Sequence, residues 1–290
     1  SAPAGFANSM KFDVTTIATG GGDYNSVKQR IEAQNLQHLK YGTADALTCT
    51  FSFWFKTTIT GIYSAYFYHH DANYTYIREF TVAASDTWEF FQVTLPGYTA
   101  TNFDNNTGPG LEVGITLASD SLTGAVDTWQ SGGDSGGSAN QVNGLSSTSN
   151  NIYTTGWQFE VGSVATDFAH EDIGTTLQKC QRYFFSTNLF EDSTRYAVGA
   201  YDATNGLGSL THFPTTMRAA PTAAFDSSVF RSAHDGALFD GTITMNFTNQ
   251  ANGYMANIST QSSATQGEWY WILDQSGDAT TGQITFTAEL

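Results

Sequence analysis

Alternation between large apolar and polar residues is the feature that most constrains how this chain folds. In the segment 48–56, one set of alternate positions holds Cys49, Phe51, Phe53 and Phe55, and the other holds Thr50, Ser52, Trp54 and Lys56. Successive side chains of a strand point to opposite faces of its sheet, so this pattern predicts a strand with one buried face. The segments 88–95 and 111–117 repeat the pattern. Strands of this kind predict a sandwich of two sheets.

The composition favours an all-β fold. Of the 290 residues, 13% are charged and 14% are aromatic. Breakers rich in glycine, proline and asparagine separate the apolar runs at 20–22, 96–97, 105–110 and 131–137, as in proteins built from many short strands. A chain of this length accommodates one large sandwich or two smaller β domains. We predict two domains.

The charge balance excludes some partners. The chain has 27 acidic and 11 basic residues, which gives a formal net charge of −16. Such a field repels nucleic-acid phosphates and anionic membrane surfaces, so we expect no nucleic acid partner. No apolar run approaches the roughly 20 residues that cross a bilayer, and we expect no membrane insertion. Loop carboxylates are a ligand type that Ca²⁺ uses, but no motif specifies Ca²⁺ or any other cofactor.

Short strand patterns return in the last third of the chain. They predict strands at 182–186, 196–201, 208–213, 222–225, 241–247, 253–258, 268–273 and 283–288. Pro214 and Pro221 lack a backbone N–H, so the segment between them is expected on a sheet edge or at a corner. This region is therefore predicted to form a second, smaller β-sandwich.

The segment 153–185 joins the two regions. Its alternation predicts a strand whose buried face holds Tyr153, Thr155, Trp157, Phe159 and Val161. After a turn, Thr175 or Thr176 is placed to cap a short helix. In this helix the side chains spaced to face inward are Leu177, Cys180 and Gln181.

The two cysteines, Cys49 and Cys180, both fall on the apolar side of a predicted element. We interpret both as small buried hydrophobic side chains. Whether they form a disulfide is left open, because a disulfide requires Cα atoms within about 7 Å of each other and the sequence does not give this distance.

Several segments together resemble a known family. They are Gly5–Ser9 (GFANS), Gln29–Glu32 (QRIE), Phe51–Trp54 (FSFW), Trp88–Gly97 (WEFFQVTLPG), Trp157–Glu160 (WQFE), Cys180–Tyr183 (CQRY) and Phe213–Thr222. In this order they resemble tailed-phage fibre, tail and head-fibre proteins, which have a carbohydrate-binding-module-like jelly roll, a "CQRY" connector and a C-terminal β-sandwich. The resemblance implies a jelly roll over 1–172, a connector helix over 173–182 and a β-sandwich over 183–290.

The same resemblance implies where the protein works. Members are virion components, so we expect a location on the tail or the capsid exterior. In the family, a region with an anchor and the first strands of the sandwich precedes a segment like 1–9 of this chain. We therefore expect a missing N-terminal segment that binds other virion proteins. The family also implies a homotrimer and a host-surface glycan as ligand.

Aromatic residues suggest where a glycan would bind, because sugar rings stack on aromatic faces. The candidates are Trp54, Tyr66, Tyr68, Asn73, Tyr74, Tyr76, Arg78 and Trp88. Among them, Trp54, Tyr66, Tyr68 and Trp88 are expected to share the face opposite the phenylalanine core. The alternative is that this face packs against a loop, the second domain or another subunit. Trp269 and Trp271 share one face of a later strand and are candidates for an interface or ligand contact.

No histidine cluster specifies a metal site. His69 and His70 are adjacent on a predicted strand, so their side chains point to opposite faces and do not readily share one ion. The segment 170–172 precedes the predicted helix, where hydrogen bonding and the helix dipole account for its charges. We expect no metal site.

No motif specifies catalysis either. Glycoside hydrolysis needs two carboxyl groups roughly 5 to 10 Å apart in a cleft. Candidates for such a pair are Asp104, Glu112 and Asp127, but 27 acidic residues give chance pairs in any case, and nothing selects one. Ser138 lies in no nucleophile-elbow motif. We therefore expect no enzyme activity.

Three functions remain as hypotheses. The first is a non-catalytic virion fibre or receptor-binding protein that adheres to a host-surface glycan. The second is a purely structural head-decoration or tail protein that binds other virion proteins. The third is a polysaccharide depolymerase. An open aromatic groove would favour the first hypothesis over the second.

Overall fold

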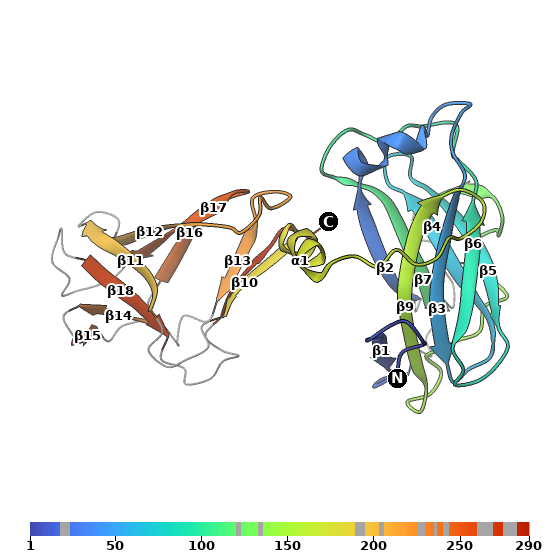
Figure 1. Ribbon diagram of the computed structural model, residues 1–290, viewed down its shortest axis with the longest axis horizontal. Helices are drawn as coiled ribbons and strands as arrows, with labels where there is room; N and C mark the ends of the chain where they lie inside the picture. Colours follow the sequence, from blue (N-terminus) through green and yellow to red (C-terminus); the bar gives the residue numbers. More distant parts are fainter. Residues whose placement is uncertain are drawn as a thin grey trace. The chain divides into compact units, whose positions relative to one another are not determined.

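The computed structural model describes residues 1–17, 24–119, 123–132, 136–188, 195–202, 206–225, 230–234, 237–239, 244–259, 269–274 and 283–289. The chain divides into two compact units, Ser1–His170 and Glu171–Leu290. Strands dominate both units (Figure 1), and the helices among the described residues are η1 (Ala33–Leu39) and α1 (Ile173–Gln181). The predicted all-β fold is confirmed.

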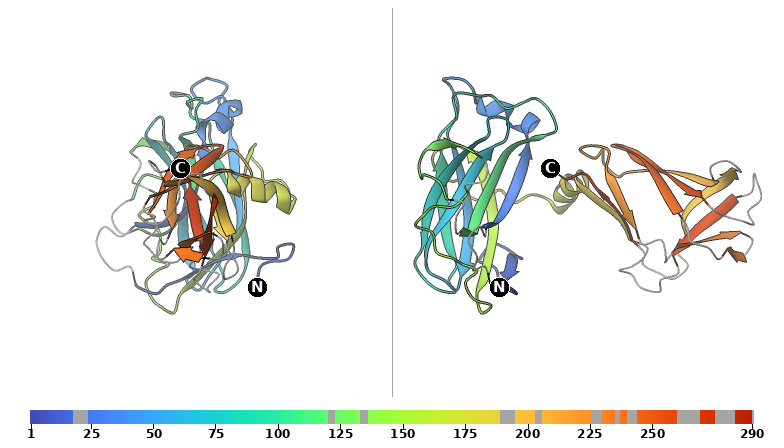
Figure 2. Two further views of the ribbon diagram at one scale, coloured as in Figure 1. Left: turned by 90° about the vertical axis from the view of Figure 1, so that its left-hand side faces the viewer. Right: turned by 180° about the vertical axis from the view of Figure 1, so that it is seen from behind.

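Two antiparallel sheets that face each other build the first unit (Figure 2). The four-stranded sheet has the order β1 (Met10–Asp13), β9 (Asn151–Val161), β3 (Cys49–Thr57), β6 (Glu89–Leu95). The five-stranded sheet has the order β2 (Tyr24–Glu32), β7 (Pro109–Ser119), β4 (Gly61–His69), β5 (Tyr74–Val82), β8 (Trp129–Ser131). Consecutive strands lie on different sheets at six places: β1 and β2, β2 and β3, β3 and β4, β5 and β6, β6 and β7, and β8 and β9. This is the connectivity of a jelly roll.

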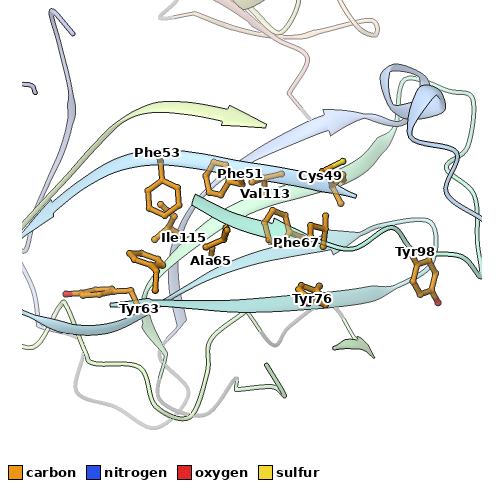
Figure 3. Close-up of a cluster of buried hydrophobic side chains, with 14 of the residues drawn as sticks. Cys49, Phe51, Phe53, Tyr63, Ala65, Phe67, Tyr76, Tyr98, Val113 and Ile115 are labelled. Carbon is orange, nitrogen blue, oxygen red and sulfur yellow. The ribbon is translucent and has the colours of Figure 1, made fainter. Parts of the chain in front are cut away.

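Aromatic side chains fill the space between these sheets. The alternate residues Phe51, Phe53 and Phe55 of β3 are buried, as the alternation predicts. Phe51 and Phe53 face β4, which carries Ala65 and Phe67 (Figure 3), and the Phe55 ring centroid is 5.3 Å from that of Tyr63. Ring centroids of Phe53 and Phe80 lie 5.1 Å apart in a T-shaped contact, a favoured geometry for aromatic pairs. Cys49 is buried at one end of this row, as predicted.

The burial pattern of β9 corrects the predicted strand face. Ile152 and Thr154 are buried at its start, whereas Trp157 and Phe159 pack against the core further along. The register with β3 shifts between these two stretches, and Gly156 has a φ of +64°. A bulge of this kind inserts one residue and exchanges the two faces. Tyr153 and Thr155 therefore lie on the outer face, contrary to the prediction.

The described residues of the second unit form two antiparallel sheets. A three-stranded sheet has the order β10 (Phe184–Asn188), β19 (Gln283–Thr287), β13 (Thr222–Phe225). A seven-stranded sheet has the order β15 (Ala237–Phe239), β14 (Phe230–His234), β18 (Trp269–Asp274), β11 (Arg195–Asp202), β12 (Gly206–His212), β17 (Gly253–Ser259), β16 (Thr244–Gln250). The sequence did not predict β14 and β15. Pro221 directly precedes β13, an edge strand, as expected for its segment.

The helix α1 corrects the predicted burial of its side chains. Asp172, not a threonine, is the N-cap, and its carboxylate accepts a hydrogen bond of 2.8 Å from the Gly174 N–H. Ile173 is 80% exposed, Leu177 is 54% exposed, and Cys180 is an exposed free thiol. Leu177 and Cys180, which were predicted to face inward, are therefore on the surface. In the described part of the chain, no helix is long and apolar enough to cross a membrane.

Replacing Phe53 by alanine should destabilise the first unit by about 3–5 kcal/mol, because the buried ring leaves a cavity between the sheets. The matched control is Phe90→Ala on the neighbouring strand β6. Since Phe90 is 47% exposed, its removal should cost less than about 1 kcal/mol. Urea unfolding of the full chain measures both values, and equal effects of the two substitutions would contradict the assigned core.

Candidate ligand-binding site

An aromatic cleft lies on the outer face of the four-stranded sheet. Trp54 on β3 and Phe90 on β6 are directly opposite each other in the ladder, and their ring centroids are 5.5 Å apart. Both residues alternate with core residues, so the sheet pleat directs them outward. The rings form one wall of the cleft.

The second wall comes from both ends of the first unit. Phe6 contacts Phe168, with ring centroids 5.0 Å apart, and also His170 at 5.5 Å. Phe168 and His170 contact each other at 4.9 Å. These three rings therefore hold the N-terminal segment against the segment that follows β9.

The floor of the cleft depends on Gly156. A Cβ atom at this position would lie 2.7 Å from Cζ of Phe6 and 3.3 Å from Cδ1 of Trp54. Gly156 also has the positive φ that the bulge requires. This glycine thus lets both aromatic walls approach the sheet.

The polar residues of the WQFE segment position the second wall. The Glu160 carboxylate accepts hydrogen bonds from the Thr166 N–H at 2.8 Å and the Thr166 hydroxyl at 2.7 Å, and these bonds lower the pKa of Glu160. The Gln158 side-chain oxygen accepts a bond of 2.8 Å from the Ala169 N–H. Both side chains therefore hold segment 165–169 beside the cleft.

The resulting cleft has a volume of about 440 Å³, and Ser52, Thr166 and Asp167 line it beside the aromatic rings. Aromatic faces with a few hydroxyl and carboxylate groups around them suit a ligand that has both C–H faces and hydroxyls.

A charged cluster occupies the outer face of the opposite, five-stranded sheet. The Glu112 carboxylate lies 2.8 Å from Arg30 Nε, 3.2 Å from Lys28 Nζ and 3.7 Å from His70 Nε2. The Tyr66 hydroxyl donates a 2.8 Å hydrogen bond to the same carboxylate. Burial raises the pKa of Glu112, but His70, Arg30, Tyr66 and the charge of Lys28 together hold this pKa well below its ordinary value. Glu112 is therefore an ionised anchor for the two cations.

Gly114 makes room for the tyrosine in this cluster. A Cβ atom at Gly114 would lie 2.4 Å from the Tyr66 ring, so the ring crosses β7 only because this residue is a glycine. Burial raises the pKa of Tyr66, so its hydroxyl stays protonated and remains a donor to Glu112.

The predicted aromatic patch is divided between the two outer faces. Trp54 lies on the four-stranded sheet, whereas Tyr66 and Tyr68 lie on the five-stranded sheet. The core faces of β3 and β4 meet, so their other faces point away from each other. Tyr66 is also buried, with 1% of its surface exposed. The expectation that these residues share one face was wrong.

The remaining candidates are dispersed. Tyr76 is buried, and its ring centroid is 5.4 Å from that of Trp129. Tyr74 contacts Tyr98 at 5.1 Å. The other three have polar partners: Asn73 accepts from the Tyr68 hydroxyl, Arg78 pairs with Asp127, and the Trp88 indole N–H donates to the Ser1 carbonyl. None of these five lines the aromatic cleft.

Trp269 and Trp271 are on β18, where Trp269 pairs with Ala200 and Trp271 lies between Val198 and Ala233. Their side chains lie outside the part of the second unit that the structure describes.

The two adjacent histidines have separate environments. His69 is buried, its ring stacks on Phe103 at 4.2 Å, and its Nε2 lies 3.2 Å from the Thr101 carbonyl oxygen. Burial lowers the pKa of His69. His70 lies beside Glu112 instead. Within the described residues, no three histidine, cysteine or acidic side chains group closely enough to hold a metal ion.

Three aromatic residues of the cleft, Phe6, Phe90 and Phe168, were not among the predicted ligand-binding residues. Phe90 carried a usable signal, because it alternates with the core residue Phe91 and so lies on the same face as Trp54. Phe6 and Phe168 gave no such signal, since they belong to irregular segments whose path depends on the fold.

Comparisons with known proteins give distant likenesses. No protein-family model matches the chain, and no curated protein matches it. Seven chains of known structure match. One is "Family 16 Carbohydrate Binding Module-2", with 17% identity over 54% of this chain and 78% of that one and a TM-score of 0.26. Another is a cycloisomaltooligosaccharide glucanotransferase of Paenibacillus sp., with 9% identity over 91% of this chain and 45% of that one and a TM-score of 0.19. TM-scores this low carry no argument about function.

The Glu112→Gln substitution should destabilise the protein by about 1–3 kcal/mol near neutral pH, because it leaves Lys28 and Arg30 without their carboxylate. The folded-state pKa lies below the ordinary 4.5, so this stabilisation is complete above that value and is lost as the pH falls below it. The difference in free energy of unfolding between wild type and variant should therefore shrink toward about pH 3. Urea unfolding across this range measures it, with the exposed Asp45→Asn as control, and a difference independent of pH would contradict the assignment.

Proposed function

We propose that this protein is a phage fibre or receptor-binding protein that adheres to a host-surface glycan and does not catalyse a reaction. The aromatic cleft on the outer face of the four-stranded sheet is the single observation that carries the proposal. It brings Trp54 and Phe90 together with hydroxyl and carboxylate groups in about 440 Å³.

The energetics of the cleft suit a sugar ring. The C–H face of a pyranose packs on aromatic rings, and the hydroxyls around its edge need hydrogen-bond partners. Phe90 is 47% exposed, so a bound ring would bury apolar surface that water now covers. The sugar hydroxyls would find hydrogen-bond partners in the lining residues Ser52, Thr166 and Asp167. The cleft is also preformed, because Glu160 and Gln158 fix its second wall, and this lowers the entropy cost of binding.

The virion role has its support in the resemblance to tail, fibre and head-fibre proteins through the WQFE and CQRY segments. In this proposal the protein acts on the tail or capsid exterior as a homotrimer that binds other virion proteins. The exposed apolar side chains of α1, Ile173 and Leu177, supply surface for such protein contacts.

A purely structural virion role is the second candidate. The same exposed side chains of α1 favour it, since an apolar helix surface fits a protein partner rather than a glycan. A depolymerase has less support, because two of the candidate carboxylates are held in ion pairs. Glu112 pairs with Lys28 and Arg30, and Asp127 pairs with Arg78.

Trp54→Ala should weaken glycan binding about tenfold, which corresponds to about 1.4 kcal/mol for one lost stacking ring. An array of bacterial surface polysaccharides identifies the ligand, and calorimetric titration compares the affinities. Trp88→Ala is the matched control, because Trp88 directly precedes β6 and does not line the cleft. Equal binding by wild type and Trp54→Ala would refute the cleft as the binding site.

Cryo-electron microscopy of the virion separates the first two candidates. Adhesion predicts peripheral copies with the Trp54 cleft open to solvent, whereas a structural protein would bury the cleft between shell or tail subunits.

A hydrolysis assay tests the third candidate, the depolymerase. Incubation of the protein with the polysaccharide that it binds should leave the length of the polysaccharide chains unchanged, and shortening of the chains would support the depolymerase instead.

A further inference from the structure

The outer face of the five-stranded sheet carries a second surface with different chemistry. One end of this face is covered, since the Thr116 hydroxyl donates to the Gly136 carbonyl at 2.7 Å and the Ser138 N–H donates to the Ser64 hydroxyl at 3.0 Å. The other end holds Lys28 and Arg30, whose side chains are 42% and 34% exposed. The sheet therefore presents two cations to solvent at its uncovered end.

Glu112 fixes the positions of these cations. Arg30 is directly opposite Glu112 in the ladder between β2 and β7, and only 6% of the Glu112 side chain is exposed. The carboxylate thus lies beneath the two cationic groups and holds both within 3.2 Å. Cations that are already held in place lose little conformational entropy when they bind a ligand.

The local charge differs from that of the rest of the chain. The other described ion pairs of lysine and arginine are one to one: Lys11 with Asp13, Arg78 with Asp127 and Lys179 with Glu171. Glu112, in contrast, has two permanent cations around it. In a chain with a formal charge of −16, the Lys28 ammonium, on a side chain that is 42% exposed, is a local attraction for an anion in a field that otherwise repels it.

A ring pair flanks the cluster on its other side. Tyr68 of β4 is opposite Glu112 in the ladder between β4 and β7, and its ring centroid lies 4.4 Å from that of His70. The strands β2 and β4 are both neighbours of β7, so their side chains are about 10 Å apart across it. That span accommodates one sugar ring with a charged substituent.

We propose that Lys28, with Arg30 beside it, binds the anionic group of an acidic glycan, a carboxylate or a sulfate ester, while the sugar ring lies across β7 toward Tyr68. This inference rests on the proposed function only in taking the ligand to be a glycan. The site is separate from the aromatic cleft, because the two lie on opposite outer faces of the sandwich. A glycan with charged and uncharged units would therefore have two distinct contacts on one protein.

Trigalacturonic acid is the first probe, and its fully methyl-esterified form is the uncharged comparison. Calorimetric titration of the full chain should show tighter binding of the acid, with an affinity that falls as salt is added. Lys28→Gln should weaken binding of the acid about tenfold, because it removes a charge-assisted hydrogen bond. Amide NMR shifts on β2 and β7, with none on β3, should locate the site.

Lys40→Gln is the matched control, since it removes the same charge from an exposed lysine at the end of η1 and should change the affinity less than about twofold. Equal affinity of Lys28→Gln and wild type for the acid would overturn the inference, as would equal affinity of wild type for the acid and its ester. N-acetylglucosamine 6-sulfate is the second probe, and tighter binding of this probe than of the acid would assign the site to sulfate esters.

Trp54→Ala separates this inference from the proposed function. The substitution should leave binding of trigalacturonic acid unchanged. If Trp54→Ala abolishes that binding and Lys28→Gln does not, the acid occupies the aromatic cleft, so the inference fails while the proposed function stands. If no neutral glycan binds but the acid binds in a Lys28-dependent way, the cleft fails and the charged site stands.

Discussion

Packing of aromatic side chains between the two sheets, largely through T-shaped contacts, is the interaction on which the rest of the first unit depends. Phe51, Phe53 and Phe55 of one sheet meet Tyr63 and Phe67 of the other, and all five are buried. Because successive residues of a strand point in opposite directions, this core also decides which side chains face solvent. It places Trp54 on one outer face and Tyr68 on the other, and so creates two surfaces where the sequence suggested one.

The two surfaces differ because different local features shape them. On the four-stranded sheet, the bulge at Gly156 exchanges the faces of β9 and leaves space for Phe6 beside Trp54. On the five-stranded sheet, Gly114 lets the Tyr66 ring cross β7 and reach Glu112. One surface is aromatic with polar edges, and the other is cationic around a buried carboxylate. A protein that adheres to a chemically mixed polysaccharide gains from both, since two weak contacts on one chain act together.

The strands of the first unit were largely predictable, because half-buried strands leave a period-two pattern in the sequence. The segment predicted at 48–56 differs from β3 by one residue at each end. The strands β14 and β15 were missed. In β14 (FRSAH) the apolar residues are not at alternate positions, and β15 has only three residues. The exposure of Leu177 and Cys180 was also missed. Helical spacing shows that residues share a face, but it does not show whether another element covers that face.

The sequence by itself determined the all-β class, the core positions on β3 and the outward direction of Trp54, because alternation is a local property of a strand. Only the tertiary structure decided what each outward residue meets. Phe6 and Phe168 reach Trp54 from opposite ends of the first unit, and Lys28, His70 and Glu112 converge from segments far apart in the chain. These contacts depend on the order of the strands and on which sheet each strand joins. Neither can be inferred from the residues adjacent in sequence.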